Sequence, residues 1–194
     1  MSVFKKVFRS KKNKVEKNTN FLIEFLAKVQ IFKNLSKHER KNLEDFVHIR
    51  EYSSGDTVFK KNYPNVVMYI VMEGYLKIYI DENCQECVKD LEKYDYFGEF
   101  GIFIDETRTA TVVAEKDSTL LAISKRDMKN FMHEYSKAGN KILFNLGQIL
   151  SKNLVKTNLV VLDKQDEIEE LQKKQEELET KIDELQAEID SLRK

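Results

Sequence analysis

The sequence predicts an α+β protein in which helices flank an antiparallel β-sandwich or barrel and a long helix continues into a parallel coiled coil. Three observations lead to this prediction. From Val47 the spacing of apolar residues changes to a period of two, and turn residues separate the short runs. A glycine-rich turn and an arginine interrupt those runs within residues 97–114. From Ile168 onward, apolar residues recur alternately three and four positions apart, as in a coiled coil.

Residues 1–18 form a basic segment that holds seven lysines and arginines and one glutamate. We interpret this segment as a flexible tail, because few of its residues could contribute to a core. An alternative follows from Val3, Phe4, Val7 and Phe8, which would share one face of a helix among cations. That pattern is typical of segments that bind the surface of an anionic membrane.

Residues 19–46 are predicted to form the N-terminal helices. An apolar stripe runs through residues 20–33 at helical spacing and indicates the first of them. Ser36 and Glu39 stand three positions apart, as in a capping box, so a second, short helix is expected to begin there. Leu43 and Phe46 would turn its apolar side inward.

The next part of the chain reads as a series of short strands. Turn residues such as Glu73 and Gly74 separate apolar runs that alternate with polar positions. Many short strands with regular turns are typical of a β-sandwich or barrel. The expected strands are 47–52, 57–61, 66–72, 75–81, 86–91, 109–115 and 118–123.

A candidate anion-binding turn follows the fifth of these strands. Gly98 and Gly101 permit a tight turn whose backbone N–H groups point one way, as in a phosphate nest or the start of a short helix. Glu99 would stand at the mouth of that turn, where an ionised carboxylate accepts hydrogen bonds from hydroxyl groups.

Arg108 is the candidate cation of the same site. Its planar guanidinium carries a permanent charge and suits a phosphate group. Thr109 and Ala110 are small enough for a ligand to approach their backbone N–H groups. The competing interpretation is an ordinary surface pair of Glu99 and Arg108 beside a hairpin.

The order of these residues resembles the phosphate-binding cassette of cyclic-nucleotide-binding domains. Here the cassette (residues 97–112) holds Phe-Gly-Glu at 97–99 and Arg-Thr-Ala-Thr-Val at 108–112. The resemblance implies a jelly-roll-like antiparallel β-roll that binds cyclic AMP or cyclic GMP. It implies that Glu99 binds the ribose 2′-hydroxyl and that Arg108 binds the cyclic phosphate. The positions that would supply further contacts are Gly98, Phe100, Thr109 and Ala110.

Two positions depart from the family pattern. Asn62 stands where many members have a glycine, and asparagine also tolerates the left-handed conformation. Tyr94 stands where many members have glycine or serine, which puts the local turn in doubt.

The β-roll with its lid helices is expected to span residues 47–160. Ser124 is a predicted helix cap, Gly139 is expected to break the helical pattern, and a long helix is expected from about Asn140. The family resemblance implies that this last helix closes over the purine. Polar residues near the expected level of the base are Asn153, Thr157 and Asn158, with solvated helix surface as the alternative.

Residues 161–194 are predicted to form a parallel two-stranded coiled coil, and so a homodimer. Isoleucine recurs at heptad position a and leucine at d, while Gln175 is a polar insertion that would fix the register. The same heptad can be drawn back through Val161 and Leu154. The lid helix and the coil would then be one continuous rod.

Together these features predict a regulatory sensor that binds cyclic AMP or cyclic GMP and signals through its coil to an unidentified effector protein. The alternative is a degenerate β-roll that acts as a scaffold or adaptor, attached to a membrane surface through residues 1–18. We expect no enzyme, because the sequence shows no nucleophile with a base and no P-loop. We also expect no metal site and no DNA-binding module. The absence of a long apolar run predicts a cytoplasmic protein.

Overall fold

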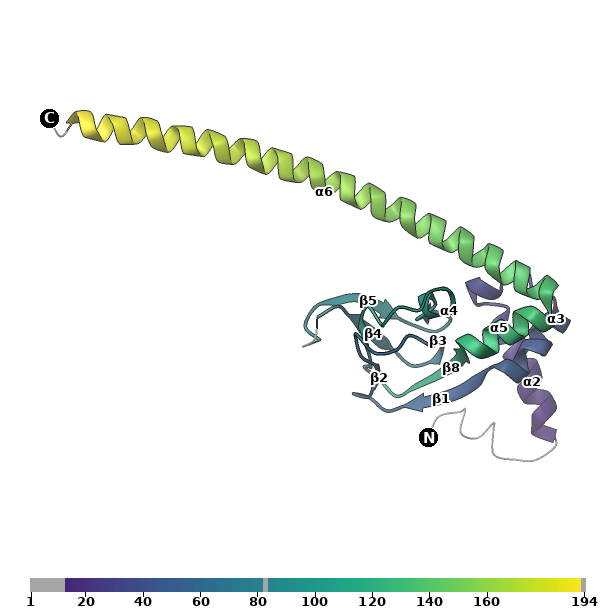
Figure 1. Cartoon of the computed structure of the whole chain (residues 1–194). Coiled ribbons are helices and arrows are strands. Elements are labelled where there is room, and N and C mark those ends of the chain that lie inside the picture. The colour runs from purple at the N-terminus through teal and green to yellow at the C-terminus, as the bar shows by residue number, and fades with distance from the viewer. Residues whose placement is uncertain (1–12, 82–83, 193–194) are drawn as a thin grey trace. The chain divides into compact units, whose positions relative to one another are not determined.

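The structure is a computed structural model that describes residues 13–81 and 84–192 (Figure 1). The described chain divides into two compact units, with the boundary between Leu146 and Gly147. The first unit holds the N-terminal helices, both sheets and the start of the last helix. The second unit holds the rest of that helix. Residues 1–12 of the predicted flexible tail, for which membrane binding was the alternative, lie outside the described residues.

The N-terminal helical part consists of α2, η1, α3 and η2 in chain order. Helix α2 spans Asn13–Leu26, and η1 spans Gln30–Phe32. The sequence prediction was wrong on both ends of the first helix, because residues 13–18 are already helical and the α-helix stops at Leu26. Its apolar residues still reach the core, where Leu26 and Phe32 are fully buried.

The predicted capping box is confirmed. It opens α3 (Lys37–Asn42), which the short 3₁₀ helix η2 (Leu43–Phe46) follows. Ser36 Oγ accepts a hydrogen bond from the Glu39 N–H at 3.2 Å, and the Glu39 carboxylate accepts one from the Ser36 N–H at 2.6 Å. The two bonds satisfy backbone donors that a helix leaves unpaired at its N-terminus.

Eight strands form two antiparallel four-stranded sheets, in the orders β1-β8-β3-β6 and β2-β7-β4-β5. This arrangement confirms the predicted antiparallel fold and all seven of the predicted strands, with each end within two residues of its predicted position. It also adds a two-residue strand, β6, which the sequence analysis missed. The strand bounds are β1 His48–Tyr52, β2 Thr57–Phe59, β3 Val67–Glu73, β4 Leu76–Tyr79, β5 Cys87–Leu91, β6 Tyr96–Phe97, β7 Thr111–Ala114 and β8 Ser118–Ser124.

Strand β3 contributes side chains to two hydrophobic cores, one on each face of its sheet. Met68, Ile70 and Met72 point to a core shared with the N-terminal helices. Val71 points the other way, into a core with Leu76 from the second sheet. Because neighbouring side chains on a strand point to opposite faces, one strand contributes to both layers. Helices α2, α3 and α5 (Lys125–Glu134) lie together at one end of the sheets (Figure 1).

Three of the turns with a left-handed backbone bear on the sequence predictions. Gly74 has φ +112° in the predicted turn between β3 and β4. Asn62 stands where glycine was expected and Tyr94 where glycine or serine was expected, and they have φ +69° and +79°. The turn at Tyr94 is therefore formed without glycine. Its ring packs 5.2 Å from the ring of Phe25 on α2, and this contact offsets part of the backbone strain.

The last helix, α6, spans Ser136–Leu192 and does not break at Gly139, so that prediction was wrong. A Cβ at Gly139 would lie 2.9 Å from the Met132 Cα on α5, so glycine is needed for close packing of the two helices. Asn145 is buried and donates hydrogen bonds to the carbonyl oxygens of Ile31 at 3.1 Å and Lys33 at 2.6 Å.

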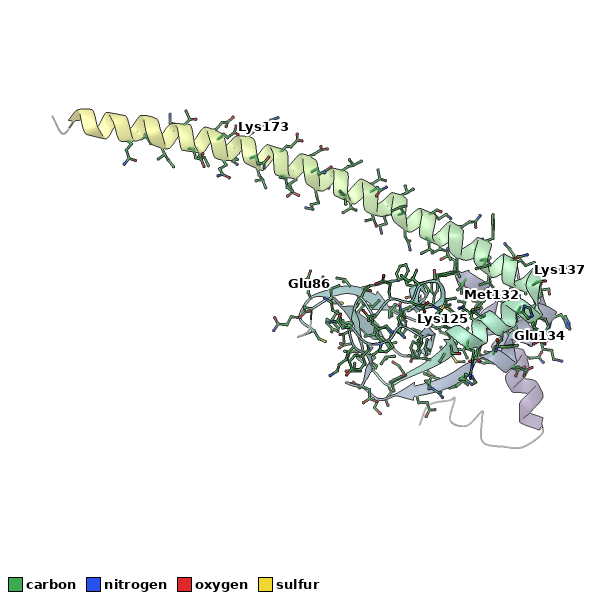
Figure 2. The ribbon with its side chains drawn as sticks, in the orientation of Figure 1. Glu86, Lys125, Met132, Glu134, Lys137 and Lys173 are labelled. Atoms are coloured by element: carbon green, nitrogen blue, oxygen red, sulfur yellow. The ribbon has the colours of Figure 1, made fainter. Side chains whose placement is uncertain are left out.

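The second unit is the continuous helical part of α6 from Gly147 onward. Figure 2 shows Lys173 projecting from this part of the helix. The apolar residues of the predicted seam, such as Leu171 and Leu178, are more than half exposed in the single chain. The coiled coil itself stays a prediction. Among the described helices, none combines the length and the apolar character needed to cross a bilayer.

Candidate ligand-binding site

A cavity of about 170 Å³ brings most of the predicted site residues together. Six of the seven predicted ligand-binding residues line it, namely Gly98, Glu99, Phe100, Arg108, Thr109 and Ala110. The seventh, Gly101, is buried beside the cavity lining against Asn65. The other residues that line the cavity are Phe59, Asn65, Ile78, Lys89, Tyr96, Phe97 and Val112.

The turn after β6 places the carboxylate of the site. Gly98 has φ +77°, and a Cβ there would overlap Arg108 Nη1 and lie 3.0 Å from the Val67 carbonyl oxygen. Only glycine fits this position without moving the arginine. Glu99 then caps the short helix α4 (Phe100–Phe103), where its carbonyl accepts a hydrogen bond from the Ile102 N–H at 3.0 Å.

The backbone of Arg108 is fixed on both sides by the turn before β3. The Arg108 N–H donates to the Tyr63 carbonyl, and the Asn62 N–H donates to the Arg108 carbonyl, both at 2.8 Å. Pro64 and Thr107 add an isolated β-bridge. The left-handed turn at Asn62 therefore sets the position from which the arginine side chain enters the cavity.

The Arg108 guanidinium is buried, with 4% of the residue exposed. Its Nη2 donates to the Val67 carbonyl at 2.7 Å, and its Cζ lies 3.8 Å from the centre of the Phe59 ring. Among the described residues, neither Nε nor Nη1 has a hydrogen-bond acceptor. Burial lowers the pKa of Arg108 to about 10, so the group is charged at neutral pH. A buried cation with free donors on a cavity favours an anionic ligand.

Glu99 is half-buried on the same cavity. Burial raises the pKa of its carboxyl group, and the charges of Lys89 and Arg108 oppose that rise. The lining therefore carries two cations and one carboxylate. A ligand with a single negative charge would make the site neutral.

Replacement of Glu99 by glutamine is expected to stabilise the ligand-free domain at pH 7. The raised pKa means that the folded protein binds the Glu99 proton more tightly than the unfolded chain does. Protonated Glu99 therefore stabilises the fold at low pH, and this stabilisation is lost as pH rises through the raised pKa. Glutamine removes the charge, so the free energy of unfolding should increase by less than about 1 kcal/mol, since solvent screens a half-exposed group.

Urea unfolding at pH 7 and pH 4 would measure this effect. The gain should shrink at pH 4, which lies below the ordinary carboxyl pKa of 4.5. Glu86→Gln, at an exposed position in the hairpin before β5, is the matched control and should leave the free energy of unfolding unchanged. A loss of stability in Glu99→Gln at pH 7 would contradict the expectation.

The sequence analysis missed several lining residues. Lys89 lies directly opposite Ile78 across the β4–β5 pair, and both line the cavity. Lys89 and the buried Leu91 stand two positions apart and so share one face of the strand, which was a signal that could have identified this face. Phe59 and Asn65 come from segments far from the cassette in sequence, and only the pairing of β2 with β7 and the bridge at Pro64 bring them near.

The predicted base-contact residues Asn153, Thr157 and Asn158 lie in the second unit, where their side chains are exposed on α6. Their role stays a prediction. Thr109 is exposed at the cavity, and Ala110 is half-buried next to it.

Comparison with known proteins finds a family model that matches part of the chain. Residues 49–135 match the sequence model of the family described as "Cyclic nucleotide-binding domain". The matched range contains both glycines of the turn, Glu99 and Arg108. The two antiparallel sheets agree with the fold of this domain, and the match supports a regulatory, cyclic-nucleotide-binding β-roll over this part of the chain.

Named relatives agree with this assignment. The chain is 27% identical to the cGMP-dependent protein kinase of Plasmodium berghei, over 72% of this chain and 15% of the relative. It is 31% identical to the cAMP-dependent protein kinase regulatory subunit of Dictyostelium discoideum, over 47% of this chain and 29% of the relative. The chain thus spans less than a third of the length of these curated relatives.

A solved structure shows the same fold. The regulatory domain of Toxoplasma gondii PKA, crystallised with cAMP, superposes with a TM-score of 0.61 at 23% identity, covering 73% of this chain and 52% of the other.

Proposed function

We propose that the β-roll binds a cyclic nucleotide, cyclic AMP or cyclic GMP, and that the chain is a cytoplasmic regulatory protein rather than an enzyme. The observation that carries this proposal is the buried Arg108 guanidinium, whose Nε and Nη1 have no acceptor among the described residues. Relatives that are named for cAMP or cGMP dependence support the choice of ligand.

The cyclic phosphate is assigned to Arg108. It would accept hydrogen bonds from the two free guanidinium nitrogens, while Nη2 stays on the Val67 carbonyl. The turn at Gly98 makes room for the Arg108 guanidinium, because a Cβ there would overlap Nη1. The single negative charge of a cyclic phosphate would balance the net positive charge of Lys89, Arg108 and Glu99.

The ribose 2′-hydroxyl is assigned to Glu99, which accepts a hydrogen bond in its ionised form. The cavity of about 170 Å³ is smaller than the roughly 300–1,000 Å³ of pockets that enclose whole ligands. It therefore suits the sugar and phosphate, and leaves the purine for contacts outside it. Asn153, Thr157 and Asn158 are the residues that we propose for those contacts.

Isothermal titration of the full chain with cyclic AMP and with cyclic GMP tests the proposal. We expect a dissociation constant in the micromolar range or below for at least one of the two nucleotides. Folded protein, freed of co-purified ligand, that binds neither nucleotide would contradict the proposal and favour a scaffold with a degenerate pocket.

The second part of the proposal is that two chains join through the coil of residues 161–194 and pass the ligand signal to an effector protein. Exposed leucine and isoleucine residues along α6, such as Leu178 and Ile182, support it, because a lone helix would leave this seam in water. Ligand would shift the signalling state only through a difference in its affinity for two conformations.

A leucine-to-lysine change in the seam is expected to dissociate the dimer. Leu178→Lys places two charges in the apolar seam and removes two buried leucines per dimer, so the dimer dissociation constant should rise by at least about 100-fold. Analytical ultracentrifugation should show the wild type at twice the 22.9 kDa chain mass. Thr180→Lys lies two positions away, off the seam, and should remain dimeric. A wild type that is monomeric at every concentration would contradict the homodimer.

A further inference from the structure

A buried amide oxygen lines the proposed nucleotide cavity without a hydrogen-bond donor. Asn65 lies in the turn before β3 and is 8% exposed. Its Oδ1 has no donor among the residues that the structure describes, and its side chain lines the same cavity as Glu99 and Arg108. Leaving a buried acceptor unpaired destabilises a fold, so a bound ligand that donates a hydrogen bond to this oxygen would be favoured.

The position of Asn65 is fixed by its neighbours. A Cβ at Gly101 would overlap both the carbonyl oxygen and Oδ1 of Asn65, so the glycine in α4 makes room for this side chain. On the other side, the bridge between Pro64 and Thr107 ties the turn to the residue before Arg108. The amide is therefore held between the two halves of the cassette.

The chemistry of the ligand restricts what this oxygen can accept. The oxygens of a cyclic phosphate carry no hydrogen and serve Arg108 as acceptors only. The donors of a cyclic nucleotide are its ribose 2′-hydroxyl and the N–H groups of its base. The small cavity suits the sugar rather than the base, which leaves the hydroxyl.

We propose that Asn65 is a specificity-determining residue whose Oδ1 accepts, together with Glu99, a hydrogen bond from the ribose hydroxyl of the ligand. The inference rests on the proposed function of the cavity. A single O–H group can serve two acceptors as a three-centre hydrogen bond. Selection of a ribose over a deoxyribose is then shared between a charged and a neutral acceptor.

The test compares each cyclic nucleotide that the wild type binds with its 2′-deoxy analogue, by isothermal titration of the full chain. Asn65→Ala should reduce the wild-type preference for the hydroxylated ligand by roughly threefold to tenfold. Asn65→Asp keeps an acceptor at the same place and should keep most of that preference, although its charge weakens binding of both ligands. A residue with only a structural role would change both affinities by the same factor.

A second variant, which leaves Asn65 unchanged, tests whether Asn65 and Glu99 both accept a hydrogen bond from the ribose hydroxyl. Glu99→Ala should retain a residual preference of at least about threefold for the hydroxylated ligand, supplied by Asn65. Loss of all preference in Glu99→Ala would overturn the inference, as would an unchanged preference in Asn65→Ala. If Asn65→Ala binds neither ligand, the result for Glu99→Ala decides. Wild-type protein that binds no cyclic nucleotide would instead reject the proposed function, and the inference with it.

Discussion

Replacing Arg108 by alanine is expected to weaken cyclic-nucleotide binding by about 2–4 kcal/mol, or roughly 30- to 1,000-fold in dissociation constant. The side chain is almost fully buried and has two nitrogens free for a phosphate. Alanine would leave the ligand charge in the cavity without its main partner. The measurement is isothermal titration of the full chain with the nucleotide that the wild type binds.

Two control variants separate the loss of the Arg108 contact from a general loss of positive charge. Arg126→Ala removes an exposed arginine at the start of α5 and should change the affinity little. Arg108→Lys keeps the charge but loses the planar fork, so its affinity should fall between those of the wild type and the alanine variant. Wild-type affinity in Arg108→Ala would contradict the assignment of the phosphate to this residue.

Loss of the glycine at position 74 is expected to have the largest effect on stability. Gly74→Ala forces an L-residue to φ +112° and makes its Cβ overlap Ser118 Oγ and lie 2.6 Å from the Ser118 Cα. Since Ser118 opens β8, whose backbone cannot yield easily, the free energy of unfolding should fall by about 3–4 kcal/mol. Urea denaturation, followed by circular dichroism, would measure it.

Gly55 offers a matched control for the same substitution. It has φ +89° in the turn before β2, but a Cβ there would meet nothing within 4 Å. Gly55→Ala should therefore cost only the backbone strain, about 1–2 kcal/mol. Equal losses in the two variants would mean that the close approach to Ser118 does not limit stability.

The fold was largely predictable because its signals are local. Strands such as β3 and β8 are short apolar runs, and turn residues such as Gly74 and Asp117 bound them. Strand β6 escaped because it is only Tyr96–Phe97 and exists through its pairing with Tyr69 and Ile70, a long-range contact. Gly139 was misread for a similar reason. Gly139 allows close packing on α5, whereas from sequence alone a glycine within a helical pattern is interpreted as a helix break.

The candidate site could be predicted as far as its motif reaches. Glu99 and Arg108 stand out because charged residues flank glycines at a recognisable spacing. Asn65 and Lys89 carry no such signal, since one follows a proline in a turn and the other is one lysine among many. Their places depend on the bridge at Pro64 and on the register of β4 with β5. The sequence identified the charged residues of the motif, and the tertiary structure was needed for Asn65 and Lys89.

The buried Asn145 has a mechanical consequence. Its amide joins the start of α6 to the carbonyl groups of Ile31 and Lys33, and one turn earlier Lys141 forms an ion pair with Glu39 at 2.8 Å. A rotation of these turns of α6 must either break all three contacts or carry η1 and α3 along with it. We therefore expect η1, α3 and the start of α6 to move together as one rigid unit. A fluorescent or spin label placed on α3 would report the displacement of a helix that begins about a hundred residues later in the chain.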